Sequence, residues 1–500
     1  MRDSKRPRIH LTPPAGWMND PHGLAIHDGR LHVFYQYEPD APRWGRMRWG
    51  HASTRDLINW DHLPIAIEPG PGGPDALGCW SGCLVQDGAG VPTIFYTGVR
   101  LAAGVRRASI RTATGTPDLA TWSKQSTPVI ASSPRGIPQD MFRDPFVWPT
   151  DQGWAMLVGA GTQLGRGVVL LYRSRDLRRW TLIGPFLTTE DLVTACPDLD
   201  VAEIDSVCWE CPQLLRFENR ACLIVSVVDR SPIVRPAHVV AVTGRIAGDR
   251  FVPSRAERLG LGPDFYAPAS LALADGRALL IGWIPEDPPA AGEERAWAGA
   301  MTLPRAVTLD PDGRPRISLV EELANMGQRS AVWEQVIVRD DQPWVVNLTD
   351  PHVELRLAMR PAGVPIRIDL TAGGRLVAEI RFDPRSCRLA ATRIGRVLVA
   401  GLSPVGSATL PSACAEELDL RIILDGSILE LIAADRVTAT VRIPEAEAAW
   451  MISCATFAGS CRIVHAELRS LGDADPRGRQ LVSDWRAQEA SRAWPRPGRA

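Results

Sequence analysis

Three acidic residues stand in short motifs whose residue types and spacing could carry out chemistry. The motifs are Asn19-Asp20-Pro21, Arg143-Asp144-Pro145 and Trp209-Glu210-Cys211. The interval from Asp20 to Asp144 is close to twice the interval from Asp144 to Glu210, as a repeated unit would place them. Three acids that converge on one pocket suit acid/base and nucleophilic work on a bond that resists water. The motifs therefore predict an enzyme.

The surroundings of Glu210 and Asp20 predict different roles. Glu210 lies between Trp209 and Cys211, where an apolar setting favours the protonated acid. Asp20 follows Asn19 and is expected to stay ionised beside turn amides. One protonated and one ionised carboxyl group are the general acid and the nucleophile of glycoside hydrolysis. Read alone, the two Asp-Pro motifs are also ordinary turn signals.

A repeat indicates the elements that position these acids. The stretch Ser53–Trp60 returns as Ser174–Trp180 and, more loosely, as Thr116–Trp122. Each copy follows a strand-like run, carries an aspartate that can brace a turn, and ends on a tryptophan that can fill the gap between neighbouring sheets. The aspartates are Asp56, Asp118 and Asp176.

The repeat has a period of about sixty residues, which gives about five units over the first three hundred residues. Blades of four short antiparallel strands around an axis are the natural architecture for such a unit. Candidate inner-strand positions then run through Asp20, Ser81, Asp144, Glu210 and Asp264. Residues 1–305 are therefore predicted to form a five-bladed β-propeller that carries the catalytic site.

The pattern changes after Pro304. Residues 306–330 are expected to be a linker with a short helix over Glu321–Met326. Residues 331–470 are expected to be a β-sandwich, with turns such as Asp425-Gly426 between some of its strands. Residues 471–500 are polar, rich in Arg and Pro, and expected to fray. The predicted fold class is all-β, a five-bladed β-propeller followed by a β-sandwich domain.

Composition narrows the class of protein. The chain holds 43 Gly and 42 Pro among 500 residues, which favours short strands and turns over long helices. A net charge of -1 provides no electrostatic footprint for nucleic acid or an anionic membrane. Apolar runs of the length of a signal peptide or a membrane helix are lacking, so a cytoplasmic location with reduced cysteines is expected. Cys208 and Cys211 form a C-x-x-C without a second pair at zinc-ribbon spacing, so no metal site is expected.

The three motifs, in this order and spacing, resemble glycoside hydrolase family 32, the β-fructofuranosidases. Further stretches share the resemblance: Tyr35–Pro39, Trp44–Ala52, Trp80-Ser81-Gly82, Asp264–Ala267, Leu303-Pro304-Arg305, and Asp425-Gly426-Ser427 with Glu430. The resemblance covers about residues 8 to 465. It implies a five-bladed propeller followed by a sandwich, in agreement with the repeat.

The resemblance also implies a retaining mechanism that needs water and no cofactor. Asp20 would attack C2 of a fructosyl unit, while Glu210 would protonate the departing oxygen and later activate water. Asp144 would hold ring hydroxyls and stabilise the transition state. Positions that match the family's fructose pocket are Trp17, Asn19, Gln36, Trp44, Trp80, Ser81, Arg143 and, more weakly, Trp283.

Departures from the family's pattern bear on the choice of substrate. His22 and Glu38 stand where the family more often has Asn, Trp80 where it usually has Phe, and Arg46 and Arg48 where Pro and His are common. Arg46 and Arg48 could pair with a phosphate group on the substrate, or they could be solvated surface residues.

The predicted activity is release of terminal β-D-fructosyl residues from sucrose or short fructo-oligosaccharides through a covalent fructosyl-enzyme intermediate. Alternatives are a sucrose-6-phosphate hydrolase, a fructosyltransferase on the same scaffold, and a carbohydrate-binding protein without catalysis. A small-molecule sugar is thus the expected partner. Asp425 and Glu430 could hold a sugar or lie at solvent-facing strand ends, and the sandwich is expected to serve a structural role or to form a homo-oligomer.

Overall fold

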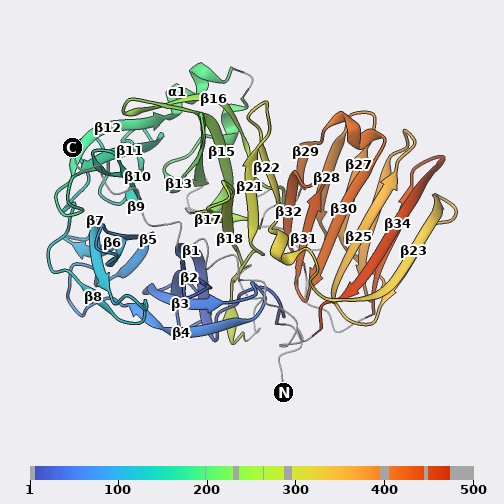
Figure 1. The fold of residues 1–500 in the computed structure, drawn as a ribbon, viewed down its shortest axis with the longest axis horizontal. Coiled ribbons are helices and arrows are strands. Elements are labelled where there is room, and N and C mark those ends of the chain that lie inside the picture. Colours follow the sequence, from blue (N-terminus) through green and yellow to red (C-terminus); the bar gives the residue numbers. More distant parts are fainter. Residues whose placement is uncertain are drawn as a thin grey trace.

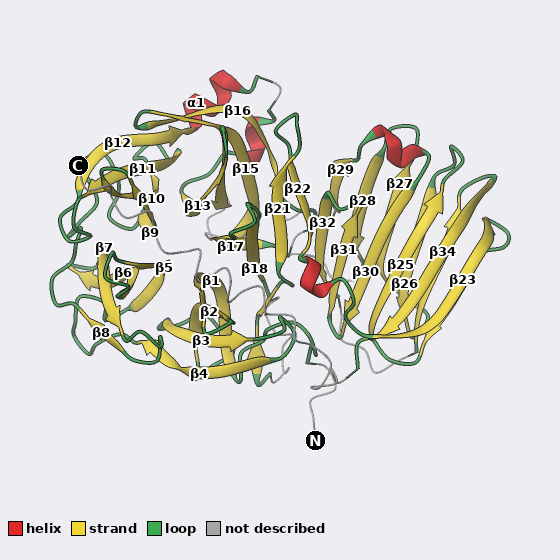
Figure 2. Cartoon of the chain, viewed as in Figure 1, coloured by secondary structure: helices red, strands yellow, loops and turns green. Residues whose placement is uncertain are grey.

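The computed structural model describes residues 6–197, 199–228, 236–262, 264–286, 295–394, 405–443 and 449–472. Within this part of the chain the regular structure is nearly all β-strand, and Figure 2 shows a few short helical segments beside the strands. These are α1 (Thr189–Ala195) and the 3-10 turns η1 (Val201–Glu203), η2 (Glu321–Leu323) and η3 (Ser412–Ala415). The all-β prediction is confirmed. None of the helices in the described ranges has the length and apolar character needed to span a membrane.

Five small sheets follow one another along the first part of the chain. The first holds β1 (Gly16–His27), β2 (Arg30–Glu38), β3 (Arg48–Thr54) and β4 (Trp60–Ile67), with β19 (Trp297–Ala298) parallel to β1. The second holds β5 (Gly78–Gln86), β6 (Pro92–Ala102), β7 (Val105–Gly115) and β8 (Trp122–Lys124). The third holds β9 (Phe142–Thr150), β10 (Gly153–Gly161), β11 (Gly167–Ser174) and β12 (Thr181–Thr188).

The fourth and fifth sheets complete this part of the molecule. The fourth holds β13 (Trp209–Phe217), β14 (Arg220–Val228), β15 (Pro236–Ala247) and β16 (Arg250–Arg258). The fifth holds β17 (Tyr266–Ala272), β18 (Ala278–Ile284), β20 (Ala300–Met301), β21 (Arg305–Leu309) and β22 (Pro315–Leu319). Because β21 and β22 pair within the fifth sheet, this sheet runs past the boundary expected at residue 305.

The first strands of the five sheets form a closed ring. Each contacts the first strand of the next sheet, in the order β1, β5, β9, β13 and β17, and β17 contacts β1 again. Figure 1 shows the five sheets arranged around a common centre, with the later strands of each sheet farther out. We call β1 to β22 the five-sheet ring. The seam of the ring is the place where the first sheet meets the fifth.

The repeat seen in the sequence builds the same turn in three sheets. Asp56 accepts hydrogen bonds from the backbone N–H groups of Ile58 and Asn59, at 3.0 and 2.7 Å. Asp176 and Asp118 accept equivalent bonds from the residues that follow them. The leucine after each aspartate has a positive φ: 65° at Leu57, 59° at Leu119 and 63° at Leu177. The prediction of aspartate-braced turns is confirmed.

Two of the repeated tryptophans fill gaps between sheets, as predicted. Trp122 of the second sheet packs edge-to-face on Phe34 of the first, with ring centroids 5.6 Å apart. Trp180, which directly precedes the last strand of the third sheet, packs in the same way on Phe95 of the second, at 5.9 Å. These aromatic contacts hold neighbouring sheets together.

The remaining strands form two six-stranded sheets, which we call the two-sheet part. One runs β23 (Gln328–Arg339), β34 (Ser460–Ser470), β25 (His352–Arg360), β30 (Leu418–Asp425), β31 (Ile428–Ala433) and β32 (Val437–Arg442). The other runs β24 (Trp344–Leu348), β33 (Trp450–Thr456), β26 (Ile366–Ala372), β27 (Arg375–Asp383), β28 (Arg388–Arg393) and β29 (Val405–Thr409). Apolar residues of both sheets share one core, among them Leu355, Ile422, Ile368 and Ile452.

A short helix before β23 and a frayed tail after β34 were the two features predicted for the ends of this part. The short helix predicted over Glu321–Met326 is a single 3-10 turn, because Gly327 adopts a positive φ of 71° and β23 begins at the next residue. Of the tail expected to fray, residues 473–500 lie outside the described residues.

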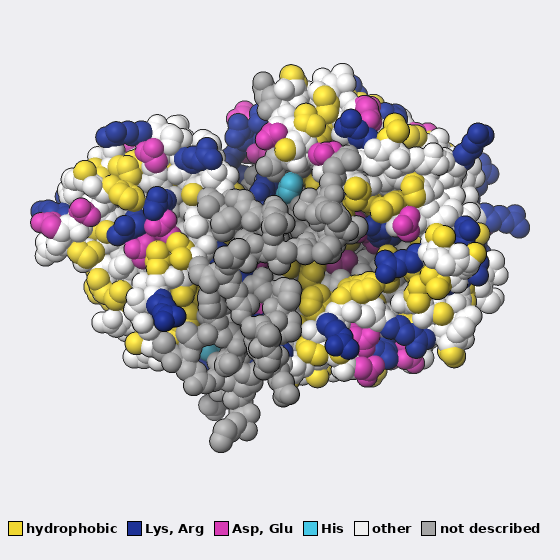
Figure 3. Space-filling view, turned by 180° about the vertical axis from the view of Figure 1, so that it is seen from behind, with side chains coloured by type: hydrophobic (Ala, Val, Ile, Leu, Met, Phe, Trp, Pro, Cys, Tyr) yellow, Lys and Arg dark blue, Asp and Glu magenta, His cyan; other side chains and the backbone are white. Residues whose placement is uncertain are grey.

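The face of the molecule in Figure 3 carries acidic and basic side chains interspersed with one another, among the atoms that are coloured by type.

The predicted surface position of Asp425 and Glu430 is wrong. Both side chains are buried where the two-sheet part meets the ring. Asp425 accepts hydrogen bonds from the backbone N–H groups of Arg8 and Ile9, at 2.8 and 3.0 Å, and pairs with Nδ1 of His10 at 2.7 Å. Glu430 pairs with Arg305 of β21 at 3.2 Å. These carboxylates therefore join the two parts of the molecule, and the structural role is supported.

We expect the His10–Asp425 pair to make stability depend on pH. Burial alone would lower the pKa of His10, but Asp425 and Glu430 outweigh it and raise the pKa to about 9. A raised histidine pKa stabilises the fold fully below the ordinary value of about 6.5, and this contribution is lost as pH rises toward 9. His10→Gln leaves Asp425 without its buried partner and should cost about 3 kcal/mol at pH 6. Thermal unfolding of both proteins at pH 6 and pH 9.5 measures the difference, which should shrink at the higher pH.

The control is His465→Gln, because His465 is exposed and pairs with Glu334 at the surface. It should shift the unfolding temperature little at either pH. A difference between wild type and His10→Gln that grows with pH would contradict the assignment of a charged His10.

Candidate active site

The three acids lie near the beginnings of innermost strands and meet at one end of the ring. Asp20 belongs to β1, Asp144 to β9 and Glu210 to β13. The thiol of Cys211, the residue after Glu210, lies between the two aspartates: its Sγ is 3.7 Å from Oδ2 of Asp20 and 3.6 Å from Oδ2 of Asp144. The backbone N–H of Cys211 also donates to Asp144 at 3.0 Å. The structure therefore brings together the residues that the motifs singled out.

A bulge at the same place in each innermost strand directs these side chains. The pairing with the second strand of the sheet shifts register between Asn19 and Pro21, Trp80 and Gly82, Arg143 and Phe146, Glu210 and Gln213, and Tyr266 and Ala269. In four of the five bulges a proline is present: Pro21, Pro145, Pro212 and Pro268. Proline has no N–H to give to the ladder, and bulges re-aim side chains next to active sites. The Asp-Pro motifs thus form bulges within strands and no connecting turns, and their catalytic role stays a prediction.

The fifth bulge uses glycine in place of proline. Gly82 follows Ser81, and a Cβ at Gly82 would lie 1.9 Å from the carbonyl oxygen of Phe95. This close approach of two strands excludes any side chain at position 82. The bulge at Ser81 therefore rests on the absence of a side chain, whereas the other four bulges rest on the absence of an N–H.

Polar side chains of neighbouring strands hold Asp20. Ser81 donates to Oδ2 at 2.7 Å, and Gln36 donates to the same oxygen at 3.2 Å. Asn19 donates to Oδ1 at 3.0 Å and accepts a bond from Nε1 of Trp17 at 2.8 Å. Trp17, Asn19, Gln36 and Ser81, all predicted to line the pocket, are thus linked to Asp20 by hydrogen bonds.

Glu210 is held by an ion pair and a phenol. Arg143 Nε lies 2.7 Å from Oε1, and Tyr266 donates to Oε2 at 2.8 Å. The apolar setting expected for Glu210 is therefore wrong, because Arg143 comes from the neighbouring sheet and its approach is not visible in the motif. Arg143 also donates to the backbone oxygen of Asp140. The Glu210 side chain keeps 21% of its surface exposed, so solvent reaches this side chain.

Tyr266 is a site residue that the sequence reasoning missed. The stretch Asp264–Ala267 belongs to the family resemblance, but the repeat predicts Asp264, and not Tyr266, as its inner-strand residue. Asp264 precedes β17 and instead accepts a hydrogen bond from the backbone N–H of Arg442 in the two-sheet part, at 2.6 Å. The sequence does carry a signal for Tyr266. When Ala267-Pro268 is aligned with Cys211-Pro212, Tyr266 takes the position of Glu210, two residues after Asp264.

Burial raises the pKa of both aspartates in the site. For Asp20, burial and the charge of Glu210 raise the pKa, against the hydrogen bonds from Ser81 and Asn19. For Asp144, burial and Glu210 raise the pKa to about 7, and the nearby Arg143 opposes them. The polar neighbours expected around Asp20 are present and lower its pKa, but burial and a second carboxylate outweigh them.

Aromatic rings stand on two sides of the acids. Trp17 and Trp283 pack edge-to-face with centroids 5.8 Å apart, and Trp283 also packs on Tyr266 at 6.4 Å. Trp44 packs edge-to-face on Trp80 at 5.8 Å, next to Ser81, and Trp44 keeps 46% of its surface exposed. Trp17, Trp80 and Trp283 thus lie beside residues that hold the acids, and Trp44 is linked to them through Trp80.

The two arginines considered for phosphate binding have partners within the protein. Arg48 pairs with Glu38 at 2.9 Å, with Asp40 at 3.1 Å and with Glu68 at 3.7 Å. Arg46 donates to the backbone oxygens of Ala76 and Pro69, at 3.0 and 2.9 Å. Two departures from the family pattern, Glu38 and Arg48, therefore form an ion pair with each other.

His22 packs inside the protein. Its ring lies on Trp49 with centroids 3.8 Å apart, and both ring nitrogens are buried without a hydrogen-bond partner. Burial holds the pKa of His22 well below its ordinary range, so the ring is neutral. This departure contributes to packing between β1 and β3.

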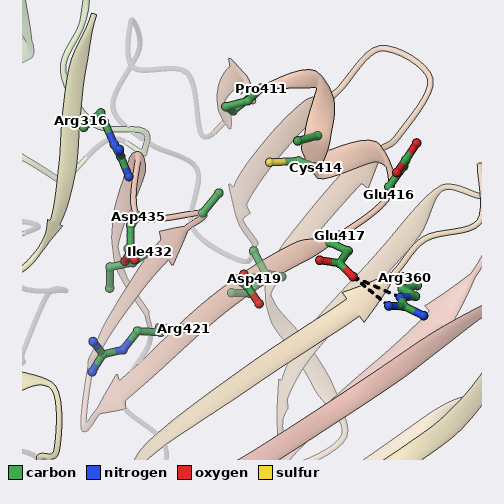
Figure 4. Close-up of a pocket in the computed structure, with 13 residues that line it drawn as sticks. Arg316, Arg360, Pro411, Cys414, Glu416, Glu417, Asp419, Arg421, Ile432 and Asp435 are labelled. Carbon is green, nitrogen blue, oxygen red and sulfur yellow. Dashed lines mark hydrogen bonds and ion pairs between the residues drawn. The ribbon is translucent and has the colours of Figure 1, made fainter. Parts of the chain in front are cut away.

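A cavity of about 770 Å³ lies away from the acids, between β22 and η3. Figure 4 shows charged side chains of both signs around it, including Arg316 and Asp435, with Glu417 paired to Arg360. Its lining residues include no aromatic ring, so it offers no platform for a sugar. In the described ranges, no group of three or more His, Cys, Asp or Glu side chains has the geometry of a metal site.

Comparison with known proteins agrees with this geometry. Residues 10–319 match the family model described as the glycosyl hydrolases family 32 N-terminal domain. Raffinose invertase from Escherichia coli is 33% identical over 466 residues, which cover 88% of this chain and 90% of that protein. Sucrose-6-phosphate hydrolase from Zymomonas mobilis is 31% identical over 449 residues, which cover 86% and 84%.

Solved structures share the fold. A family 32 β-fructofuranosidase from Bombyx mori has a TM-score of 0.75 and 25% identity, with 94% of this chain and 95% of that chain covered. Fructan 1-exohydrolase IIa from Cichorium intybus has a TM-score of 0.77 and 23% identity, with 94% and 98% covered, which shows a likeness of fold. Since the family match spans more than half of the sequence and the two curated relatives align over most of it, the chain belongs to glycoside hydrolase family 32.

Proposed function

We propose that this protein is a retaining β-fructofuranosidase, with Asp20 as nucleophile, Glu210 as general acid and base, and Asp144 as the stabiliser of the transition state. One observation carries the proposal: three acids from three different sheets meet at one end of the ring, each held by its own donors. The closed ring of five sheets supports a five-bladed propeller, and the two sheets around one core support a β-sandwich.

One carboxyl oxygen of Asp20 has fewer hydrogen-bond donors than the other and would be the attacking atom. Oδ2 accepts from Ser81, Gln36 and the Cys211 thiol, whereas Oδ1 accepts a single bond from Asn19. Oδ1 would form the bond to the anomeric C2 of the fructosyl unit while the bond from C2 to the departing oxygen breaks. The hydrogen bonds to Oδ2 keep the carboxylate in one orientation during both steps.

Glu210 would move the proton. In the first step it gives its proton to the departing oxygen, and in the second it removes a proton from the water that attacks C2 and frees Asp20. Arg143 and Tyr266 bind one oxygen each, so the carboxyl group keeps its direction in both protonation states. The remaining exposure of Glu210 supports entry of the water.

Asp144 would bind the sugar ring. Its backbone is strained, with a φ of 62°, and its N–H donates to Oγ1 of Thr97 at 2.9 Å. One carboxyl oxygen accepts from Cys211, which leaves the other for ring hydroxyls. Hydrogen bonds to those hydroxyls can strengthen as the ring flattens toward an oxocarbenium ion.

The substrate that the site supports best is plain sucrose or a short fructo-oligosaccharide. Relatives include a raffinose invertase and a sucrose-6-phosphate hydrolase, and a Bombyx mori β-fructofuranosidase has been solved with sucrose bound. The internal partners of Arg46 and Arg48 weaken the case for a phosphorylated sugar. Transfer of the fructosyl unit to a second sugar, a cytoplasmic location and an assembly of copies through the sandwich remain predictions from the sequence.

Asp20→Asn tests the nucleophile. The amide cannot form the covalent intermediate, so release of glucose and fructose from sucrose should fall by about four orders of magnitude. The matched control is Asp61→Asn, since Asp61 is an exposed partner of Arg30 on the outer strand β4. An Asp20→Asn protein that keeps a tenth of its activity would remove Asp20 from this role.

The same variant should be more stable than the wild type near neutral pH. Because the pKa of Asp20 is raised in the folded protein, the unfolded chain loses this proton first as pH rises above about 4, and stability falls until pH passes the folded value. The unfolding temperature of Asp20→Asn should therefore exceed that of the wild type at pH 7, and the gap should close toward pH 4. Unfolding curves at both values measure it, and a gap that widens in acid would contradict the raised pKa.

Phosphorylated sucrose distinguishes the two hydrolase readings. With Arg46 and Arg48 already paired, kcat/KM for sucrose should exceed that for sucrose 6-phosphate by about tenfold or more, since a phosphate would lose hydration without gaining a cation. Arg48→Gln should leave the ratio of the two values unchanged. Preference for the phosphorylated sugar that disappears in Arg48→Gln would establish the sucrose-6-phosphate hydrolase instead.

A further inference from the structure

We propose that Glu38 is a positioning residue, which fastens the loop carrying Trp44 and so sets how tightly the enzyme binds its sugar. The loop comprises residues 39–47, between β2 and β3, and we call it the rim loop. This inference rests on the proposed function, because it assigns Trp44 to the wall of the sugar site.

Glu38 stands on the strand that also supports the nucleophile. It is the last residue of β2, two positions after Gln36, which donates to Asp20. Residues two apart on a strand lie on the same face, so Glu38 faces the side of the sheet that carries the acids. In the pairing of β1 with β2, Gln36 lies opposite Asn19 and Glu38 opposite Trp17.

The carboxylate of Glu38 gathers both ends of the rim loop. Oε1 accepts from the backbone N–H of Asp40 at 3.2 Å, and Oε2 accepts from the backbone N–H of Arg46 at 2.8 Å. Nη1 of Arg48 donates to Oε1 at 2.9 Å, and the Glu38 side chain is only 10% exposed. Buried hydrogen bonds to a charged acceptor are among the stronger ones in proteins.

The loop is shaped to this carboxylate. A Cβ at Gly45 would lie 2.8 Å from Oε2 of Glu38, so a side chain at position 45 would displace the carboxylate from its present position. Gly45 lies between Trp44 and Arg46, and the latter is the residue whose N–H reaches Glu38. The direction in which Trp44 leaves the loop therefore follows from the contact of Gly45 and Arg46 with Glu38.

The far side of the rim loop is joined to the second sheet. The carbonyl oxygen of Met47 accepts from the backbone N–H of Cys79 at 2.9 Å, one residue before Trp80. The Arg46 guanidinium bridges to Pro69 and Ala76. Trp44 packs on Trp80, the residue before Ser81, and nearly half of the surface of Trp44 stays exposed. Glu38 is thus the link between the strand that holds Asp20 and the outer wall of the site.

Glu38→Gln is the test variant. An amide NH2 group would face at least one backbone N–H, so the loop loses an acceptor as well as the charge that Arg48 needs. We expect KM for sucrose to rise about tenfold with kcat changed less than about twofold, the scale of one lost charged hydrogen bond. Trypsin should also cleave the variant several-fold faster after Arg43 or Arg46, which reports the freedom of the loop without any substrate.

A double-mutant cycle separates positioning from general damage. Trp44→Ala should raise KM by itself, and adding Glu38→Gln to it should raise KM no further, because Glu38 acts through Trp44. The control is Glu354→Gln, a fully buried carboxylate that pairs with Arg356 and Arg421 in the two-sheet part. It should leave both KM and the tryptic pattern of the rim loop unchanged. If Glu38→Gln does not fold, Glu38→Gln/Arg48→Met removes both charges and serves in the same cycle.

The possible results are distinct. Additive effects of Glu38→Gln and Trp44→Ala, a loss confined to kcat, or an unchanged rate of tryptic cleavage would overturn the positioning role. A wild-type protein that releases no fructose from sucrose would overturn the proposed function instead. In that case cleavage after Arg43 or Arg46 still decides whether Glu38 fastens the loop.

Discussion

The X-Pro bulge in the innermost strands is the constraint on which the site depends. A strand in a sheet must give its N–H groups to a neighbour, and proline cannot. At Asp20-Pro21, Asp144-Pro145 and Cys211-Pro212 the ladder therefore breaks, and the residue before proline turns out of the pleat. Since the five innermost strands form a closed ring, these three breaks meet a fourth proline bulge at Ala267-Pro268 and the glycine bulge at Ser81-Gly82 around one centre. Repetition of a single backbone irregularity thus assembles a site from residues far apart in the sequence.

The three carboxyl groups lie close enough for their negative charges to repel one another. The surrounding residues compensate this repulsion only in part. Arg143 is the cation in contact with Glu210, while Asp20 and Asp144 have neutral donors: Ser81, Asn19, Gln36 and the Cys211 N–H. Neutral donors orient a carboxylate but compensate its charge less than a guanidinium does. Burial, and after it the charge of Glu210, therefore raise the pKa values of Asp20 and Asp144 against these donors. Such strain is tolerable because the ring around the site is packed and closed.

Local features of this chain could be predicted from the sequence, whereas long-range partners could not. The braced turns at Asp56 and Asp176 depend on residues two and three positions away, so the repeat in the sequence predicts them. The strand positions of the three acids followed from the same period. In contrast, the hydrogen bond from Arg442 to Asp264, the hydrogen bond from Tyr266 to Glu210, and the buried pair of Asp425 and His10 each join residues far apart in the sequence. A single sequence carries no direct sign of such pairs.

The position of those long-range contacts explains why a catalytic ring has a second part that does not touch the acids. A ring built from one chain has one seam, where the fifth sheet must hold the first. The ion pair of Asp425 with His10 holds the segment that leads into β1. Glu430 pairs with Arg305 of the fifth sheet, and the backbone N–H of Arg442 donates to Asp264, which directly precedes that sheet. Both sides of the seam are thereby fixed to one rigid pair of sheets. Because β1 carries Asp20 and β17 carries Tyr266, opening the seam would separate Asp20 from the residue that donates to Glu210. The contacts of the two-sheet part therefore hold together the two sheets that carry these residues.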